Sequence, residues 1–158
     1  MLVFSDSHGR TLGMVRAVRQ QQPDAVFHLG DCERDTQRLE KEFPDLPLYR
    51  VCGNCDREPV NPEVLQCTLD GVKFFCTHGA PLRREVYARR AAQRGLLRRG
   101  GHRALRPHAP RHAQRDRCRD SYVVNPGTAG VGAMCTYACI ETRDGAIRSA
   151  GIHAIPEA

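Results

Sequence analysis

Side chains that bind divalent metal ions follow apolar segments at several points within the first eighty positions. The short motifs are Asp6-x-His8, Gly30-Asp31, Gly53-Asn54-x-Asp56 and Thr77-His78-Gly79. Carboxylate oxygens and imidazole nitrogens are ligands for Mn²⁺, Fe²⁺ or Zn²⁺, and a carboxylate such as that of Asp31 can bridge two ions. Two ions about 3.5 to 4 Å apart clamp a phosphoryl group and convert bound water to hydroxide at neutral pH. The set predicts hydrolysis of phosphate esters without a protein nucleophile.

Each of these residues also has a purely structural interpretation. Asp6 and Asp31 are residue types that cap helices, Asn54 is suited to a turn with positive φ, and His78 is compatible with an ordinary loop. Taken singly, each motif is a weak signal. The ordered set, in which every motif follows an apolar segment, favours a metal site that includes Asp6, His8, Asp31, Asn54 and His78.

Alternating strands and helices are expected to position these side chains. Apolar segments at residues 2 to 5, 25 to 29 and 48 to 52 predict strands, and residues 11 to 22 and 33 to 43 predict the helices between them. Such alternation predicts a parallel sheet with helices packed on it. Ligands in this architecture gather beyond the carboxyl ends of the strands, where Asp6, Asp31 and Asn54 fall.

The second half of the chain predicts further strands within one domain that spans residues 1 to 158. Segments 64 to 69 and 72 to 77 form a predicted hairpin that turns at Asp70-Gly71. Residues 83 to 99 are expected to be helical, and residues 121 to 124 form a strand. The last predicted strands, at 134 to 141 and 146 to 155, turn at Asp144-Gly145.

With these motifs, the sequence resembles the calcineurin-like metallophosphoesterases, and particularly their small single-domain prokaryotic phosphodiesterase branch. In that branch Gly-Asn-Cys-Asp, here at residues 53 to 56, replaces the Gly-Asn-His of longer enzymes. The segment Asn125-Pro126-Gly127-Thr128 is similar to the branch's Asn-Pro-Gly-Ser. The resemblance implies an α/β fold, a metallophosphoesterase-like sandwich of two mixed β-sheets flanked by helices, and a dinuclear metal site.

The resemblance also implies a role for each candidate residue. Asp6 and His8 would bind the first metal, Asp31 would bridge, and Asn54 and His78 would bind the second. Asp31, Asn54 and His78 would be the catalytic residues, with two divalent ions as cofactors. Mn²⁺ is the favoured ion, with Fe, Zn and Ni as alternatives. Cys55 replaces the histidine of larger relatives, so bound water or another group must protonate the leaving group.

The family's last motif, Gly-His-Thr-His, supplies one ligand to each metal and is absent here. The region where it is expected reads Leu105-Arg106-Pro107-His108-Ala109-Pro110-Arg111-His112. His108 lies nearest to the expected place, with His102 and His112 as fallbacks. A lone histidine in a basic loop is more often simply solvated. Loss of two ligands is expected to weaken metal binding and to impair the protein.

A compensated frameshift or sequencing error over roughly residues 90 to 120 is our hypothesis for the missing motif. With suitable synonymous codons, residues 106 to 110 read one base later spell Gly-His-Thr-His. GC-rich DNA read out of frame also accounts for the 13 Arg at residues 83 to 119, which contain only Glu85 and Asp116 as acidic residues. The coding DNA tests this, and the hypothesis fails if neither shifted frame contains the motif.

Composition places the chain among ordinary globular proteins. Hydrophobic residues make up 41% and charged residues 27% of 158 positions, and no apolar run approaches the length of a membrane span. The N-terminus lacks the features of a signal peptide, so we expect a cytoplasmic protein. The eight cysteines are expected to be reduced thiols. Thioredoxin-like Cys52-x-x-Cys55, or a zinc site with Cys135 and Cys139, is a weaker interpretation.

Two other functional classes compete with a phosphodiesterase that acts on small phosphodiesters or nucleotides. A relative with a degraded metal site can act as a protein-binding scaffold, and the missing motif favours this class. A basic nucleic-acid-binding protein is consistent with the net charge of +6, and it predicts affinity that falls steeply with salt. Aromatic residues at 6%, without Trp, disfavour a stacking platform for bases. The sequence leaves the oligomeric state open.

Overall fold

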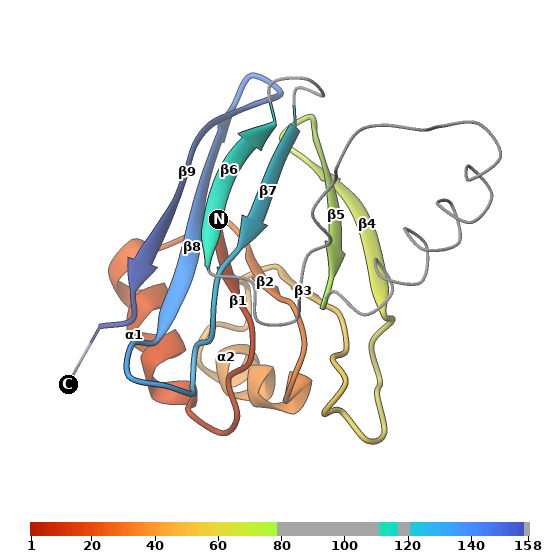
Figure 1. Ribbon diagram of the computed structural model, residues 1–158, viewed down its shortest axis with the longest axis vertical. Helices are drawn as coiled ribbons and strands as arrows, with labels where there is room; N and C mark the ends of the chain where they lie inside the picture. Colours follow the sequence, from red (N-terminus) through yellow and green to blue (C-terminus); the bar gives the residue numbers. More distant parts are fainter. Residues whose placement is uncertain (79–110, 117–120, 157–158) are drawn as a thin grey trace, which may run out of the picture.

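The centre of the fold is a five-stranded mixed sheet (Figure 1). The computed structural model describes residues 1–78, 111–116 and 121–156. The sheet has the order β3-β2-β1-β8-β9, with β1 (Leu2–Phe4), β2 (Val26–His28), β3 (Leu48–Arg50), β8 (Thr136–Arg143) and β9 (Ala146–Ala154). β1, β2 and β3 run parallel, whereas β8 is antiparallel to both β1 and β9. The predicted parallel arrangement of the first three strands is confirmed.

Helices cover one face of this sheet (Figure 1). α1 (Thr11–Gln21) buries Met14, Val15 and Val18, whose spacing places them on one side of the helix. They pack with Leu39 of α2 (Thr36–Glu42) against apolar side chains of β1 and β2. A 3-10 turn, η1 (Glu33–Asp35), precedes α2, so the second predicted helix begins as a 3-10 turn. The residue that caps the C-terminus of α1, Gln22, has a left-handed conformation and lies directly before a proline.

The opposite face of the sheet packs against a second layer of strands (Figure 1). This layer contains β4 (Val64–Leu69) paired with β5 (Val72–Thr77), and β6 (His112–Asp116) paired with β7 (Ser121–Asn125). Phe27 of the central sheet lies between Tyr49 and Phe74, with ring centroids 5.0 and 5.3 Å away. Cys76 and Val124 join the same apolar cluster. Within the described residues, the result is a sandwich with helices on one side.

The structure confirms the predicted α/β class and refines its second layer. In the described segments this layer consists of two separate antiparallel pairs rather than one mixed sheet. The hairpin at Asp70-Gly71 has its predicted bounds, and both turn residues have positive φ, 47° and 73°. Asp144 and Gly145 turn in the same way. Neither α-helix in the described ranges has the length and apolar character of a membrane span.

One strand was not predicted. β6 lies in the Arg-, Pro- and His-rich region and pairs with β7 over its whole length, from His112 opposite Asn125 to Asp116 opposite Ser121. Its sequence, His-Ala-Gln-Arg-Asp, has no apolar alternation, so pairing with β7 defines it instead. The helix expected at residues 83 to 99 lies outside the described residues, as does most of the segment in our frameshift hypothesis.

Candidate active site

Parallel pairing of β1 and β2 brings the first two sequence motifs together. The Leu29 amide donates to Phe4 O at 2.8 Å, and the Asp6 amide donates to Gly30 O at 3.0 Å. The strand ladder therefore continues into the loops that carry Asp6 and Asp31. The Val51 amide donates to His28 O at 3.1 Å. This bond brings the loop after β3 to the same end of the sheet. The predicted convergence at the carboxyl ends of these strands is confirmed.

Asp6, His8 and Asp31 form a compact group of potential metal ligands. One ligand atom from each lies within 4.8 Å of the other two. His8 Nε2 is 4.0 Å from Asp6 Oδ1 and 3.9 Å from Asp31 Oδ2. Asp31 is buried, Asp6 is half-buried and His8 is exposed, so the group opens to solvent on one side. Two carboxylates and one imidazole are a donor set that fits a divalent first-row metal ion.

His78 approaches Asp31 from the other layer, at the end of β5. Its Nε2 lies 3.4 Å from Asp31 Oδ1, and its Nδ1 lies 2.8 Å from Leu29 O. A carbonyl oxygen only accepts hydrogen bonds, so the proton of the neutral ring is on Nδ1. The lone pair of Nε2 is then directed to the Asp31 side, as a metal-ligating histidine requires.

Asn54 is close to the group in sequence, but its side chain is not part of the compact cluster. It is exposed, and its amide donates to Cys55 Sγ at 3.4 Å. The Cys55 amide instead donates to Asp31 Oδ1 at 2.8 Å. Asp56 supports the loop by accepting hydrogen bonds from the Glu33 and Gly53 amides at 2.9 and 2.8 Å. Candidates His102 and His108 lie outside the described residues, and His112 begins β6.

The backbone at the cluster is strained. Asp6, His8, Asp31 and Cys32 all have positive φ, between 43° and 68°. Such conformations cost free energy in residues with side chains, and they concentrate at functional sites. Gly53 approaches Asp31 so closely that a Cβ there would lie 2.2 Å from Asp31 Oδ1. Close packing of three loops thus sets the position of Asp31.

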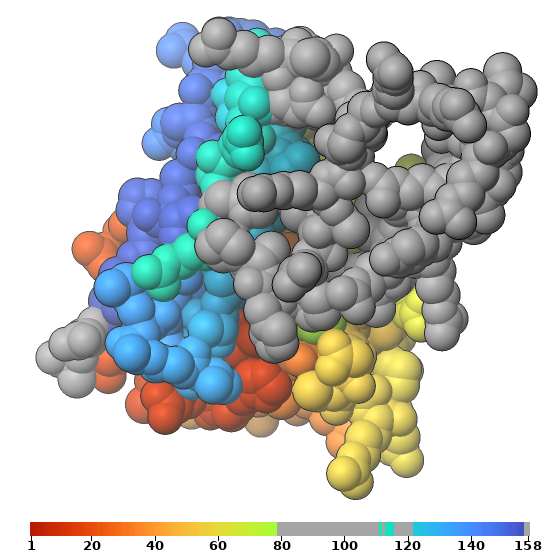
Figure 2. Space-filling view, viewed as in Figure 1, coloured from red at the N-terminus to blue at the C-terminus, as the bar shows by residue number. Residues whose placement is uncertain are grey.

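Hydrogen bonds from the segment after β7 hold the loop that carries Asp6. Thr128 Oγ1 donates to Asp6 O at 3.0 Å, and the Gly130 amide donates to the same oxygen at 3.1 Å. A Cβ on Gly130 would lie 1.7 Å from Ser7 O. Figure 2 shows the two segments in contact, with residues near 130 in light blue beside the red N-terminal region. The Asn-Pro-Gly-Thr motif thus holds the backbone at Asp6, which its sequence alone did not reveal.

Glu33 is another residue that sequence reasoning missed. It is 3% exposed, and its carboxylate accepts hydrogen bonds from the Val60 amide at 2.6 Å and from Asn61 Nδ2 at 2.8 Å. It therefore anchors the far end of the loop that begins at Gly53. The sequence signal was only an acidic residue in the first turn of a predicted helix, which also describes an ordinary solvated carboxylate.

The described cysteines are free thiols, as predicted. A hydrogen bond to Asp31 is the main cause that raises the pKa of the Cys55 thiol, so this residue stays protonated at neutral pH. Burial raises the pKa of Cys52, and it raises that of Cys76 to about 12. Protonated thiols are poor nucleophiles and poor metal ligands. The thioredoxin-like and zinc interpretations of Cys52 and Cys55 therefore gain no support.

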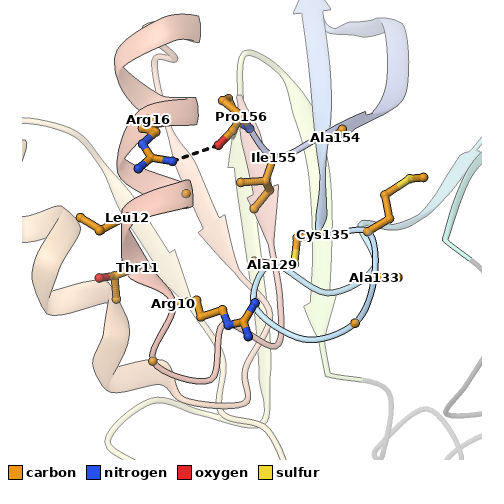
Figure 3. A pocket seen from close by; sticks show the side chains of 14 residues that line it. Arg10, Thr11, Leu12, Arg16, Ala129, Ala133, Cys135, Ala154, Ile155 and Pro156 are labelled. Carbon is orange, nitrogen blue, oxygen red and sulfur yellow. Dashed lines mark hydrogen bonds between the residues drawn. The ribbon is translucent and has the colours of Figure 1, made fainter. Parts of the chain in front are cut away.

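A pocket of about 550 Å³ lies beyond the loop that carries His8 (Figure 3). It is lined by Gly9 and Arg10, by the first turns of α1, by part of the segment 129–135, and by residues 154–156. Arg16 in its wall donates to Pro156 O at 3.4 Å, drawn as a dashed line in Figure 3. Arg10 and Arg16 thus place two cations in the wall of this pocket.

A sandwich with carboxylates and imidazoles at its strand ends fits the class of metal-binding α/β proteins. Comparison with protein families specifies the class further. The profile of the calcineurin-like phosphoesterase superfamily domain matches residues 1–145. The chain belongs to this superfamily, whose metallophosphoesterases bind divalent metal ions and act on phosphate esters.

Individual proteins are similar to this chain in sequence or in fold. A protein of Mycoplasma pneumoniae, named as a probable metallophosphoesterase, is 32% identical over 80 residues, which are 50% of this chain and 46% of the relative. The match thus spans about half of that relative's length. A predicted phosphoesterase of Streptococcus pneumoniae has a similar structure, with a TM-score of 0.60 at 22% identity over 97% of this chain and 95% of its own.

Vps29 of Entamoeba histolytica in complex with Zn²⁺ also has this fold. Its TM-score is 0.60 at 15% identity, and the alignment covers 98% of both chains. At this identity the likeness concerns the fold alone. The same architecture is therefore found both in a chain described as a phosphoesterase and in a vacuolar sorting protein.

Proposed function

We propose that the chain is a divalent-metal-dependent phosphodiesterase with a dinuclear site. The position of Asp31 between two imidazoles supports this proposal most strongly. Its Oδ2 faces His8 Nε2 at 3.9 Å, and its Oδ1 faces His78 Nε2 at 3.4 Å. Each oxygen of one buried carboxylate thus has its own imidazole neighbour, which is the arrangement a bridging ligand requires.

Each of the two metal ions would have its own set of ligands, with Asp31 common to both. Asp6, His8 and Asp31 would hold one ion, and Asp31 with His78 and Asn54 would hold the other. When bound, such ions polarise a phosphoryl group and lower the pKa of water beside it. His78 is oriented by its bond to Leu29 O, and Asp31 by the Cys55 amide. The proton for the leaving group would come from water or another group, because Cys55 replaces the relevant histidine.

Hydrolysis of bis-p-nitrophenyl phosphate tests this function. We expect turnover that requires added Mn²⁺ and is abolished by a chelator. Asp31→Asn keeps the size of the side chain but removes the charge, so it should abolish metal-dependent turnover. Asp45→Asn, at an exposed turn residue, is the matched control and should match wild type. Absence of turnover in wild type with Mn²⁺, Fe²⁺, Zn²⁺ and Ni²⁺ would contradict the proposal.

A protein-binding scaffold is the second candidate function. It is supported by the absent Gly-His-Thr-His motif and by the structural likeness to Vps29. The presence of Asp6, His8 and Asp31 as a compact group favours the enzyme instead. A scaffold predicts a folded chain that does not hydrolyse phosphomonoesters or phosphodiesters with any of these metal ions. Small phosphodiesters or nucleotides as substrates, Mn²⁺ as the native ion and a cytoplasmic location stay predictions.

A further inference from the structure

A chain of hydrogen bonds that begins at a buried histidine of β2 and ends at the surface connects β2 to the loop between the candidate ligands Asp6 and His8. Ser7 Oγ lies 3.1 Å from His28 Nε2 and donates to Asp35 Oδ2 at 2.7 Å. The same Asp35 oxygen accepts the Gly9 amide at 2.6 Å. Ser7 and His28 are both 0% exposed. One carboxylate therefore binds the loop on both sides of His8.

The tautomer of His28 follows from its partners. The Gly30 amide approaches Nδ1 at 3.3 Å, so Nδ1 is the acceptor and the proton is on Nε2. His28 then donates to Ser7 Oγ, which has its own proton free to donate to Asp35. The donors of His28 and Ser7 point in one direction, from β2 to Asp35. The series extends from Gly30, beside Asp31, to Gly9, beside His8.

The Asp35 side chain does not cap its own helix, α2. It occupies the N-cap position of α2, where an aspartate ordinarily accepts amides of the first turn. Here no side-chain cap bond forms, and the backbone of Asp35 is helical, with φ −62° and ψ −23°. Its Oδ2 instead contacts Ser7 and Gly9, residues of a different loop. The carboxylate thus stabilises the candidate site in place of the local helix.

The loop it holds needs such support. Asp6 and His8 have φ values of 55° and 43°, and Gly9 has 82°. Without fixed partners for Ser7 and Gly9, this segment would relax toward conformations with negative φ. The imidazole of His8 would then leave its position near Asp6 and Asp31, and ligand geometry would be lost.

We propose that Asp35 is a positioning residue, which, through Ser7 and Gly9, holds His8 and Asp6 in the conformation that binds metal. His28 supports it from the buried side. This inference rests on the proposed metal site, but it concerns residues that do not touch the metal or the substrate. Residues that orient metal ligands typically change metal affinity by about 10 to 100-fold when they are removed.

Mn²⁺ binding measured by calorimetry and by electron paramagnetic resonance tests the proposal without hydrolysis. Asp35→Ala should weaken Mn²⁺ binding by about 10 to 100-fold. Asp35→Asn retains one carbonyl oxygen that accepts both hydrogen bonds, so it should recover most of the affinity. Asp45→Ala, at an exposed carboxylate, should bind like wild type. A purely structural role predicts a lower melting temperature of Asp35→Ala without a change in Mn²⁺ affinity, and that outcome would overturn the proposal.

A second variant covers the case in which Asp35→Ala does not fold. Ser7→Ala removes only a buried hydroxyl, and we expect a smaller loss of Mn²⁺ affinity together with faster hydrogen exchange at the Gly9 amide. Unchanged affinity in Ser7→Ala, with no folded Asp35→Ala, would also overturn the proposal, as would a wild-type chain that binds no Mn²⁺. Normal Mn²⁺ binding without turnover would contradict only the enzymatic function and leave the role of Asp35 intact.

Discussion

His78 Nε2 lies 3.4 Å from Asp31 Oδ1, although the two residues belong to different layers of the sandwich. Asp31 follows β2 in the central sheet, and His78 follows β5 in the second layer. The bond from His78 Nδ1 to Leu29 O fixes the ring against the strand that precedes Asp31. Docking of the two layers therefore completes the candidate site.

Replacement of His78 should remove one of two metal ions. His78→Asn shortens the side chain so that it no longer reaches Asp31, while Asp6 and His8 stay in place. We expect the Mn²⁺ stoichiometry to fall from two to one and kcat to fall by about 100-fold. Calorimetric titration and hydrolysis of bis-p-nitrophenyl phosphate measure the two effects. His153→Asn, at an exposed histidine, is the control, and two ions still bound to His78→Asn would refute this role.

Buried His28 should make the fold sensitive to acid. Burial lowers its pKa from 6.5 to about 4, against the opposing effect of Asp35 and Asp56. Below pH 6.5 the unfolded chain takes up a proton that the folded chain excludes until about pH 4, so stability falls as pH decreases through this window. The expected loss from this group is roughly 3 kcal/mol.

Urea unfolding of the metal-free chain at pH 7.5 and pH 4.5 measures this effect. His28→Gln keeps a nitrogen that donates to Ser7 but does not ionise, so the difference between the two pH values should shrink by about 2 to 3 kcal/mol. His153→Gln, exposed on β9, should retain the wild-type difference. An equal pH dependence in wild type and His28→Gln would show that His28 is not the group responsible.

Sequence patterns were sufficient to predict the strands that runs of apolar side chains mark. The segments around Val3 and Phe27 are short and buried on both faces, and the Asp70-Gly71 turn specified the bounds of its hairpin. β6 escaped prediction because its sequence has no apolar alternation, and its position depends on pairing with β7. A strand defined mainly by pairing is visible only in three dimensions.

The candidate site, like the fold, could be predicted from the sequence only in part. Asp6, His8 and Asp31 could be predicted because parallel strands must bring their carboxyl ends together. The role of Asp35 could not, because an aspartate before a helix has the sequence signature of a cap. The placement of Asn54 in the second metal position stays a prediction, because its amide contacts Cys55 in this structure.

Thr128 should contribute to both stability and activity. Its hydroxyl donates to Asp6 O at 3.0 Å and accepts the Val131 amide at 2.9 Å. Thr128→Val preserves the shape but removes the partner of the Val131 amide and one of the two donors to Asp6 O, which should lower the free energy of unfolding by about 1 to 3 kcal/mol. We also expect weaker Mn²⁺ binding, because the Asp6 backbone loses a fixed contact. Chemical denaturation and calorimetry measure both, with Thr68→Val, at an exposed position of β4, as the control.

Cysteine labelling should follow exposure and thiol pKa. Cys76 is 8% exposed with a pKa of about 12, so iodoacetamide at pH 7.5 should modify it only after unfolding. Cys55 is exposed and should be labelled in the folded chain, although slowly, because its hydrogen bond to Asp31 raises its pKa. Peptide mass spectrometry resolves the two sites. Rapid modification of Cys76 in the native chain would be inconsistent with the packing of β5 on the central sheet.

Anomalous scattering from crystals grown with Mn²⁺ tests the dinuclear site most directly. We expect two manganese peaks that share Asp31, one between Asp31 Oδ2, Asp6 and His8, and the other between Asp31 Oδ1 and His78. An Asp31→Asn crystal prepared in the same way should lack both. Two shared peaks would establish the bridging role of Asp31, whereas no manganese within coordination distance of Asp31 in the wild-type crystal would contradict it.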